Sequence, residues 1–140
     1  MNLSLDHVGW TTRNVEAFEA FWCDIVGYKR SQLSTVSGEM LSALFGVAGT
    51  AEIRRYHHDL MTPDIEIHCF SEGSQMAPMG FHRDGLSHVC LMTGSSGSRK
   101  AFIAGFPSWV EVKIFNNPKG WENIFVRDLE QNWIELRERF

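Results

Sequence analysis

Short segments of alternating hydrophobic and polar residues run along most of this chain, and a few segments carry apolar residues at helical spacing instead. Residues 3–11 alternate as in a β-strand, whose successive side chains point to opposite faces. Asn14 is a suitable N-terminal cap for a helix, because its side chain accepts hydrogen bonds from free backbone N–H groups. The apolar residues that follow at helical spacing are Val15, Phe18, Phe21, Trp22 and Ile25. We expect this helix to end near Gly27, with strands next at 28–36, 50–57 and 63–70 and one or two helical turns between Gly38 and Gly46.

The same order of elements recurs in the second half, in fewer residues. The pattern there predicts a strand at 86–93, a helix at 97–105 and strands near 109–115, 121–127 and 132–138. The segment LDHVGWTT from Leu5 recurs as LSHVCLMT from Leu86, and the segment DIEIH around Glu66 has its counterpart, WIELR, around Glu135. The sequence therefore predicts an α+β fold of two tandem βαβββ modules, which form a curved, cleft-shaped mixed β-sheet with the helices outside.

We expect the first module to span residues 1–72 and the second, shorter module to span 86–140. The segment 73–85 is rich in Gly, Ser, Met and Pro and is interpreted as the linker between them. At 140 residues in total, the two modules are expected to pack as one compact domain.

Composition narrows the classes of partner. The chain has 13 basic and 17 acidic residues, a formal charge of −4, which argues against a nucleic-acid or anionic membrane partner. No apolar run approaches the ~18 residues that span a bilayer, and the N-terminus lacks the basic and apolar stretches of a signal peptide. Three widely spaced cysteines indicate reduced thiols, so we expect a cytoplasmic protein.

A histidine and a glutamate recur at corresponding places in the two modules: His7 and Glu66 in the first, His88 and Glu135 in the second. Each lies on an otherwise apolar strand face, where a polar side chain is costly unless it is paired or bound to a cation. Taken alone, any one of them is more often a hydrogen-bonded core histidine or a solvated glutamate than a metal ligand. As a repeated set, two imidazoles and two carboxylates suit a divalent ion such as Ni, Co, Zn, Mn or Fe.

Two neighbouring features leave alternatives open. His68 shares a strand face with Glu66 and could itself be the first module's ligand. The internal alignment places Glu66 opposite Glu135, so we prefer Glu66. Arg54 and Arg55 could meet an anionic group of a substrate, although a solvated strand is the default expectation for such a pair.

At these residues the sequence resembles the vicinal oxygen chelate superfamily, which includes glyoxalase I, methylmalonyl-CoA epimerase, extradiol dioxygenases, and fosfomycin- and bleomycin-resistance proteins. The opening LDHVGWTTRNVEAFEAFWCDIVGYKR is similar to the first strand and helix of that family, and LFGVAG followed by DIEI is similar to the approach to its IEL strand. The ending RDLEQNWIEL resembles the family's closing hairpin, although Leu129 and Gln131 replace its usual Pro and Gly.

This resemblance implies that His7, Glu66, His88 and Glu135 are the metal ligands, as in some glyoxalase I enzymes. It implies a metal-dependent isomerase or lyase of the glyoxalase or epimerase type, acting on a small molecule with two adjacent oxygens. In such a site a metal-polarised carbonyl favours loss of a neighbouring proton through an enediolate, with Glu66 and Glu135 as candidate catalytic bases.

Other classes remain as alternatives. A non-catalytic drug-binding protein of the bleomycin-resistance type would need an apolar cleft and no metal. An extradiol-type dioxygenase is less expected, because the second module offers only His88 and Glu135 as ligands. No nucleotide-cofactor motif is present. Because exposed sheet edges are commonly covered by pairing, we expect a homodimer.

Overall fold

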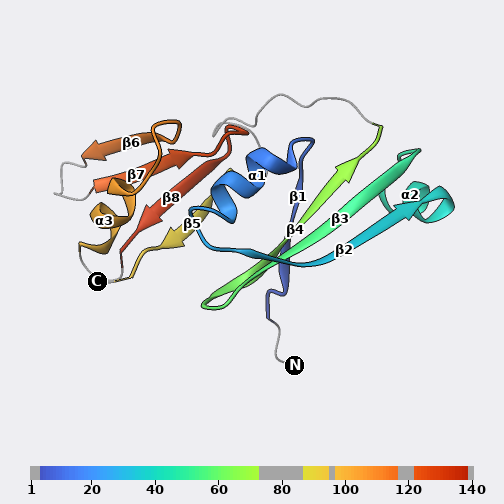
Figure 1. The fold of residues 1–140 in the computed structure, drawn as a ribbon, viewed down its shortest axis with the longest axis horizontal. Coiled ribbons are helices and arrows are strands. Elements are labelled where there is room, and N and C mark those ends of the chain that lie inside the picture. The colour runs from blue at the N-terminus through green and yellow to red at the C-terminus, as the bar shows by residue number, and fades with distance from the viewer. Residues whose placement is uncertain (1–3, 73–86, 95–96, 117–121, 139–140) are drawn as a thin grey trace. The chain divides into compact units, whose positions relative to one another are not determined.

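The computed structural model describes residues 4–72, 87–94, 97–116 and 122–138, and the chain divides into two units, Met1–Met76 and Ala77–Phe140 (Figure 1). The elements of the first unit are β1 (His7–Thr11), α1 (Val15–Trp22), β2 (Lys29–Ser37), α2 (Gly38–Phe45), β3 (Thr50–His58) and β4 (Met61–Phe70). They form a four-stranded sheet in the order β1-β4-β3-β2. Strand β1 is parallel to β4, and the other neighbours are antiparallel, so the sheet is mixed.

The core of the first unit lies between α1 and one face of this sheet. Phe18, Phe21 and Trp22 of α1 are fully buried. The ring of Trp10 in β1 lies 5.2 Å from that of Trp22, and the ring of Tyr56 in β3 lies 5.1 Å from that of Phe18. Because α1 covers this face, the side chains on the opposite face of β1, β3 and β4 are left for other contacts.

Helix α1 begins as predicted and ends earlier than predicted. The Asn14 side chain accepts a hydrogen bond from the backbone N–H of Ala17 at 3.0 Å, which confirms the cap. The helix stops at Trp22, before Ile25. Beyond it, Asp24, Val26 and Gly27 donate to carbonyls five residues back, although Cys23 and Ile25 still donate to carbonyls four residues back. This wider turn takes the chain out of the α-helical pattern before Gly27, whose φ is 100°.

The second unit contains β5 (Val89–Met92), α3 (Ser98–Ala104), β6 (Glu111–Asn116), β7 (Glu122–Arg127) and β8 (Trp133–Arg137). Its sheet has the order β5-β8-β7-β6, again with one parallel pair, β5 with β8. Its described core residues are Val110, Ile124, Val126, Ile134 and Leu136. Helix α3 is attached through Glu138, whose Oε1 accepts hydrogen bonds from the backbone N–H groups of Gly97 and Arg99.

The two units therefore repeat one order of elements, and the predicted α+β fold of two βαβββ modules is confirmed. Helix α2 is the addition in the first unit, and it occupies the predicted excursion between Gly38 and Gly46. The predicted linker, 73–85, lies outside the described residues, and the module boundaries stay predictions. Among the described residues, no helix combines the length and apolar character that crossing a bilayer requires.

The hairpin between β7 and β8 forms although Gln131 replaces the usual Gly. Asp128 is buried there, and its Oδ1 accepts hydrogen bonds from the backbone N–H groups of Glu130 and Asn132, each at 2.9 Å. Gln131 adopts a φ of 67°, in the left-handed region that favours glycine. Its side chain accepts a hydrogen bond from Arg127 Nη1 at 2.8 Å.

We expect Gln131→Gly to be more stable than Gln131→Ala by about 1 kcal/mol, because both lose the contact with Arg127 and only glycine relieves the left-handed backbone. Urea unfolding of the two variants measures this difference. Equal free energies of unfolding would show that the turn holds no backbone strain.

Candidate functional site

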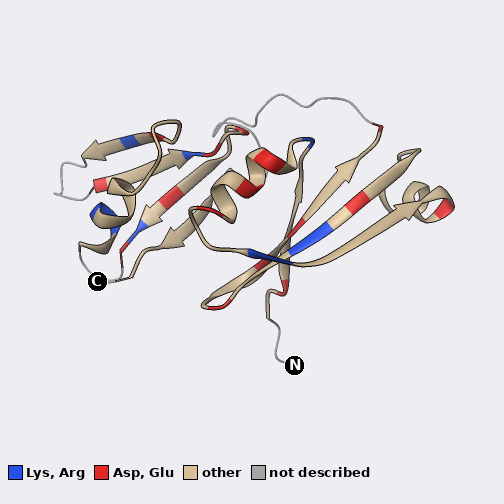
Figure 2. Ribbon diagram, in the orientation of Figure 1, with Lys and Arg blue, Asp and Glu red and all other residues tan. Residues whose placement is uncertain are grey.

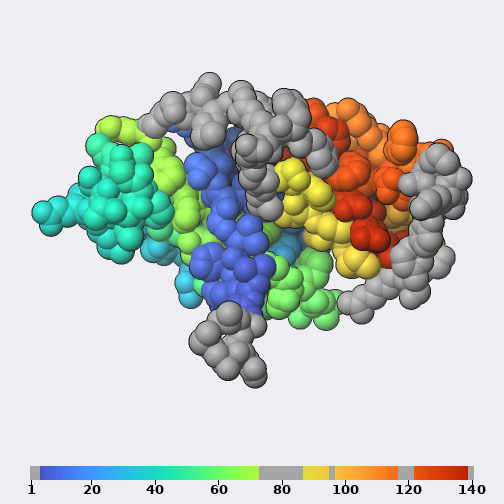
Figure 3. Space-filling view, turned by 180° about the vertical axis from the view of Figure 1, so that it is seen from behind, coloured from blue at the N-terminus to red at the C-terminus, as the bar shows by residue number. Residues whose placement is uncertain are grey.

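The polar residues of the first unit gather on the sheet face opposite α1. The parallel register pairs His7 with Asp64, Gly9 with Glu66 and Thr11 with His68, so alternate residues of β1 and β4 share this face. The segment around β1, blue in Figure 3, lies on the surface in that view.

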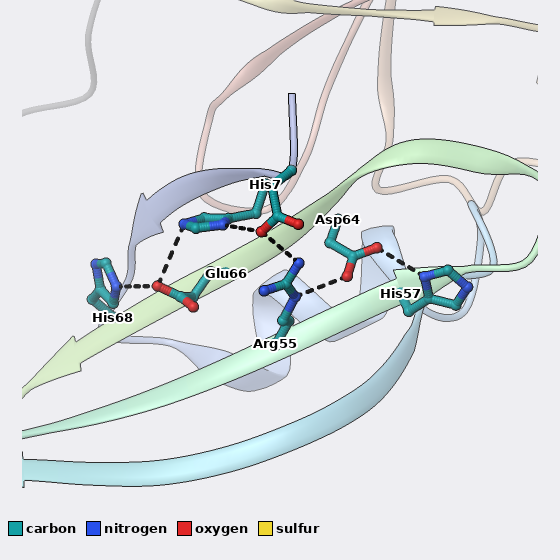
Figure 4. Close-up of polar contacts among 7 residues, drawn as sticks. His7, Arg55, His57, Asp64, Glu66 and His68 are labelled. Atoms are coloured by element: carbon teal, nitrogen blue, oxygen red, sulfur yellow. Dashed lines mark hydrogen bonds and ion pairs between the residues drawn. The ribbon is translucent and has the colours of Figure 1, made fainter. Parts of the chain in front are cut away.

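His7 and Glu66 are brought together on this face, and His68 joins them. The Nε2 atom of His7 lies 3.8 Å from Oε1 of Glu66 (Figure 4). The same oxygen accepts a hydrogen bond from Nε2 of His68 at 2.9 Å. We call His7 and Glu66 the first half-site.

The other ring nitrogen of His7 is fixed by the residue before it. Nδ1 of His7 lies 2.9 Å from Oδ2 of Asp6. The hydrogen bond from His7 and the neighbouring Arg55 guanidinium lower the pKa of Asp6 from its usual value. An ionised carboxylate only accepts, so Nδ1 of His7 carries a proton, and Nε2 is the nitrogen that faces Glu66. A histidine protonated at Nδ1 binds a metal through Nε2.

Arg55 connects Asp6 to the rest of the sheet. Its Nη2 donates to Oδ2 of Asp6 and its Nε donates to Oδ2 of Asp64, both at 2.8 Å. The other oxygen of Asp64 accepts a hydrogen bond from Nδ1 of His57, also at 2.8 Å. These contacts with His57 and Arg55 lower the pKa of Asp64. These contacts form one continuous network that runs from His57 through Asp64, Arg55 and Asp6 to His7.

Arg54 and Arg55 are consecutive residues of β3, which carries basic and acidic positions along its length (Figure 2). Their side chains therefore lie on opposite faces of the strand and have different partners. Arg54 forms ion pairs with Glu52 of its own strand and with Glu19 of α1. The default expectation of a solvated strand is wrong for both arginines. Asp6 directly precedes the candidate ligand His7 in the sequence, and this adjacency was the signal that could have pointed to Asp6.

His68 is held from its other side by aromatic rings. The ring of Phe45, at the end of α2, lies 5.3 Å from the His68 ring and 5.5 Å from that of Phe70. Gly9 faces His68, and a Cβ at Gly9 would lie 3.8 Å from Cε1 of that ring. His68 therefore has a fixed position from which it orients the Glu66 carboxylate.

The second unit holds a similar pair. Nε2 of His88 lies 3.4 Å from Oε2 of Glu135, and we call these two residues the second half-site. Nδ1 of His88 is 2.9 Å from the hydroxyl of Ser87, again the residue before the histidine. The ring of Phe125 lies 5.6 Å from the imidazole. Cys90 is paired with Glu135 in the sheet register.

The geometry of each half-site fits one metal ion. Two donors at about 2.0–2.2 Å from one tetrahedral ion lie about 3.3–3.6 Å apart. The two nitrogen-to-oxygen distances, 3.8 and 3.4 Å, are close to that separation. No group of three or more His, Cys, Asp and Glu side chains within the described residues is arranged to hold a metal ion. Each half-site therefore offers two donor groups, one imidazole and one carboxylate.

Sequence comparisons identify no relative: no family profile matches the chain, and no curated protein does. Solved structures do share its architecture. A glyoxalase family protein from Bacillus cereus matches with a TM-score of 0.77 and 16% identity, over 99% of this chain and 95% of that one. The fosfomycin resistance protein FosX from Listeria monocytogenes matches with a TM-score of 0.66 and 16% identity, over 98% and 94%. The trypanothione-dependent glyoxalase I of Leishmania major matches with a TM-score of 0.62 and 13% identity, over 98% and 87%.

The chain therefore has the paired βαβββ architecture of the glyoxalase and fosfomycin-resistance proteins. This is the fold of the vicinal oxygen chelate superfamily, and the resemblance seen in the sequence is confirmed at the level of the fold.

The pKa of the Cys90 thiol depends on the charge of Glu135. Burial, and then the neighbouring Glu135, raise the pKa of the Cys90 thiol to about 11. Since the thiolate is the reactive form, we expect Glu135→Gln to speed alkylation of Cys90 by about three- to tenfold at about pH 8. Mass spectrometry after timed treatment with iodoacetamide measures the rate.

Cys23 is the internal control for this measurement. Its pKa is also raised to about 11, by burial and then by Glu19 and Asp24 of the first unit. Its alkylation rate should be the same in both proteins. An unchanged rate at Cys90 would show that Glu135 does not act on the thiol.

Proposed function

We propose that this protein is a metal-dependent isomerase or lyase of the glyoxalase or epimerase kind, acting on a small molecule with two adjacent oxygens. The observation that supports this most is the repeated half-site: in each unit a histidine turns Nε2 toward a glutamate while the preceding side chain holds Nδ1. Fixing one ring nitrogen so that the other is free for a cation is how metal-binding histidines are commonly oriented.

The proposed ligands are His7, Glu66, His88 and Glu135, and together the two half-sites supply two imidazoles and two carboxylates to one ion. This mixed nitrogen and oxygen donor set suits Ni, Co, Zn, Mn or Fe. When bound, such an ion polarises a substrate carbonyl and stabilises the negative charge that develops when the adjacent carbon loses a proton.

The residues of the chain would then move that proton. A carboxylate beside the polarised carbonyl accepts the proton and returns it, so Glu66 and Glu135 are the candidate bases. Glu66 already accepts a hydrogen bond from His68, which orients it. Glyoxalase I of Leishmania major and FosX of Listeria monocytogenes share the fold, and this supports a small-molecule substrate without identifying it.

The direct test combines metal binding with turnover. Metal-free protein is titrated with Ni²⁺, Co²⁺, Zn²⁺, Mn²⁺ and Fe²⁺ in a calorimeter, and each loaded protein is assayed with hemithioacetals and 2-substituted acyl-CoA thioesters. We expect at least one metal to bind with a stoichiometry of one per chain and to support turnover. Failure of both would contradict the proposal and favour the non-catalytic binding protein.

Variants of Glu66 and Glu135 distinguish the roles of the two carboxylates. We expect Glu66→Gln and Glu135→Gln each to weaken metal binding, and the variant that removes the base to lower kcat by about 10²- to 10⁴-fold. Assays at saturating metal separate the loss of chemistry from the loss of affinity. A kcat close to that of the wild type in both variants would exclude both residues as bases.

The proposal includes a cytoplasmic homodimer, because each four-stranded sheet has two edge strands that pairing would cover. Mixing two inactive proteins tests whether one site takes ligands from two chains. If it does, refolding the His7→Gln variant together with the His88→Gln variant restores about a quarter of the wild-type activity, since half of the dimers carry one intact site of two. If all four ligands come from one chain, the mixture stays inactive.

A further inference from the structure

The first half-site depends on a surface carboxylate that has little support of its own. Asp6 precedes β1 and its side chain is 71% exposed. A carboxylate in that position ordinarily samples several rotamers in water. Yet Asp6 is the residue that holds Nδ1 of His7.

Arg55 supplies the missing support. It lies in β3, is 24% exposed, and donates to Asp6 and Asp64 at once through Nη2 and Nε. Asp64, in β4, is more buried still and is held in turn by His57. The guanidinium is thus anchored to Asp64 of the sheet through Nε (Figure 4) and reaches Asp6 through Nη2.

Electrostatic repulsion is a second reason why Asp6 needs the contact with Arg55. Asp6 and Asp64 are two carboxylates that share one cation, and without it they would repel each other. The exposed Asp6 is the one free to move away. His7 would then lose the acceptor for its Nδ1 proton.

We propose that Arg55 is a positioning residue which, through Asp6, holds His7 in the Nδ1–H tautomer with Nε2 toward Glu66. This inference rests on the proposed function for its consequence, a preorganised metal ligand, while the tautomer itself is a property of the metal-free protein. The planar guanidinium reaches two separate carboxylates in a fixed geometry, which a lysine does not reproduce.

The chain contains two controls. Arg54 is the neighbouring residue, is also mostly buried and is also ion-paired, and its partners lie on the other face of the sheet. His88, in the second unit, is held at Nδ1 by the neutral hydroxyl of Ser87.

The first readout is the tautomer of His7 in metal-free protein. Long-range ¹H–¹⁵N correlation spectra at about pH 8, where an ordinary imidazole is neutral, distinguish the two tautomers, and a His7→Gln variant assigns the signal. We expect the wild type and Arg54→Met to show the Nδ1–H form. Arg55→Met should show a mixture of tautomers, Arg55→Lys an intermediate population, and His88 no change in any of these proteins.

The second readout is the dissociation constant for Co²⁺ alone, measured by calorimetry. Arg55→Met should weaken Co²⁺ binding by about 10- to 100-fold, as loss of an outer-shell partner does, and Arg54→Met should leave it unchanged. Thermal unfolding of the two methionine variants shows whether they are equally folded.

Asp6→Ala provides a variant that changes only an exposed side chain outside the strands. It should reproduce both effects of Arg55→Met, the mixture of His7 tautomers and the weaker Co²⁺ binding. The Asp6→Ala/Arg55→Met double variant should bind Co²⁺ no more weakly than Asp6→Ala alone, because Arg55 acts through Asp6. Wild-type tautomer and Co²⁺ affinity in Arg55→Met, or additive effects in the double variant, would overturn the inference. If the wild type binds no Co²⁺, the proposed function fails and the tautomer readout still decides the role of Arg55.

Discussion

Parallel pairing of β1 with β4 sets Gly9 opposite Glu66, and this register determines which side chains meet in the first unit. Because successive residues of a strand alternate between faces, Trp10 packs against α1 while His7 points to the polar face. A shift of one residue would exchange the two sets, burying His7 under the helix and exposing the aromatic ring. The aromatic core under α1 therefore fixes the position of the half-site on the other face.

The polar face carries more negative than positive charge. Asp6, Asp64 and Glu66 are three carboxylates against one guanidinium, that of Arg55. Counted against Arg55 alone, these carboxylates leave an excess of two negative charges. The divalent cation of the proposed function would offset that excess.

The sequence was sufficient to predict the elements and to select candidate ligands, because both leave a periodic or repeated signal. Alternation located the strands, and the recurrence of LxHV selected His7 and His88. The contacts of Arg55 left no such signal, since they join β1, β3 and β4 and depend on the register of all three. The early end of α1 and the left-handed Gln131 depend on backbone hydrogen bonds that a pattern of side chains does not encode.

The two half-sites repeat their histidine and glutamate and differ in the residues that support them. Under the proposed function, this difference bears on which carboxylate would move the proton. Glu66 is oriented by the hydrogen bond from His68, whose ring packs against Phe45. Glu135 has Cys90 as its neighbour in the register, and a thiol is a weaker donor than an imidazole N–H. A base must change its contacts during the reaction, whereas a ligand gains from keeping them. Under the proposed function, the weaker contacts of Glu135 would favour it as the base, with Glu66 as the more permanent ligand.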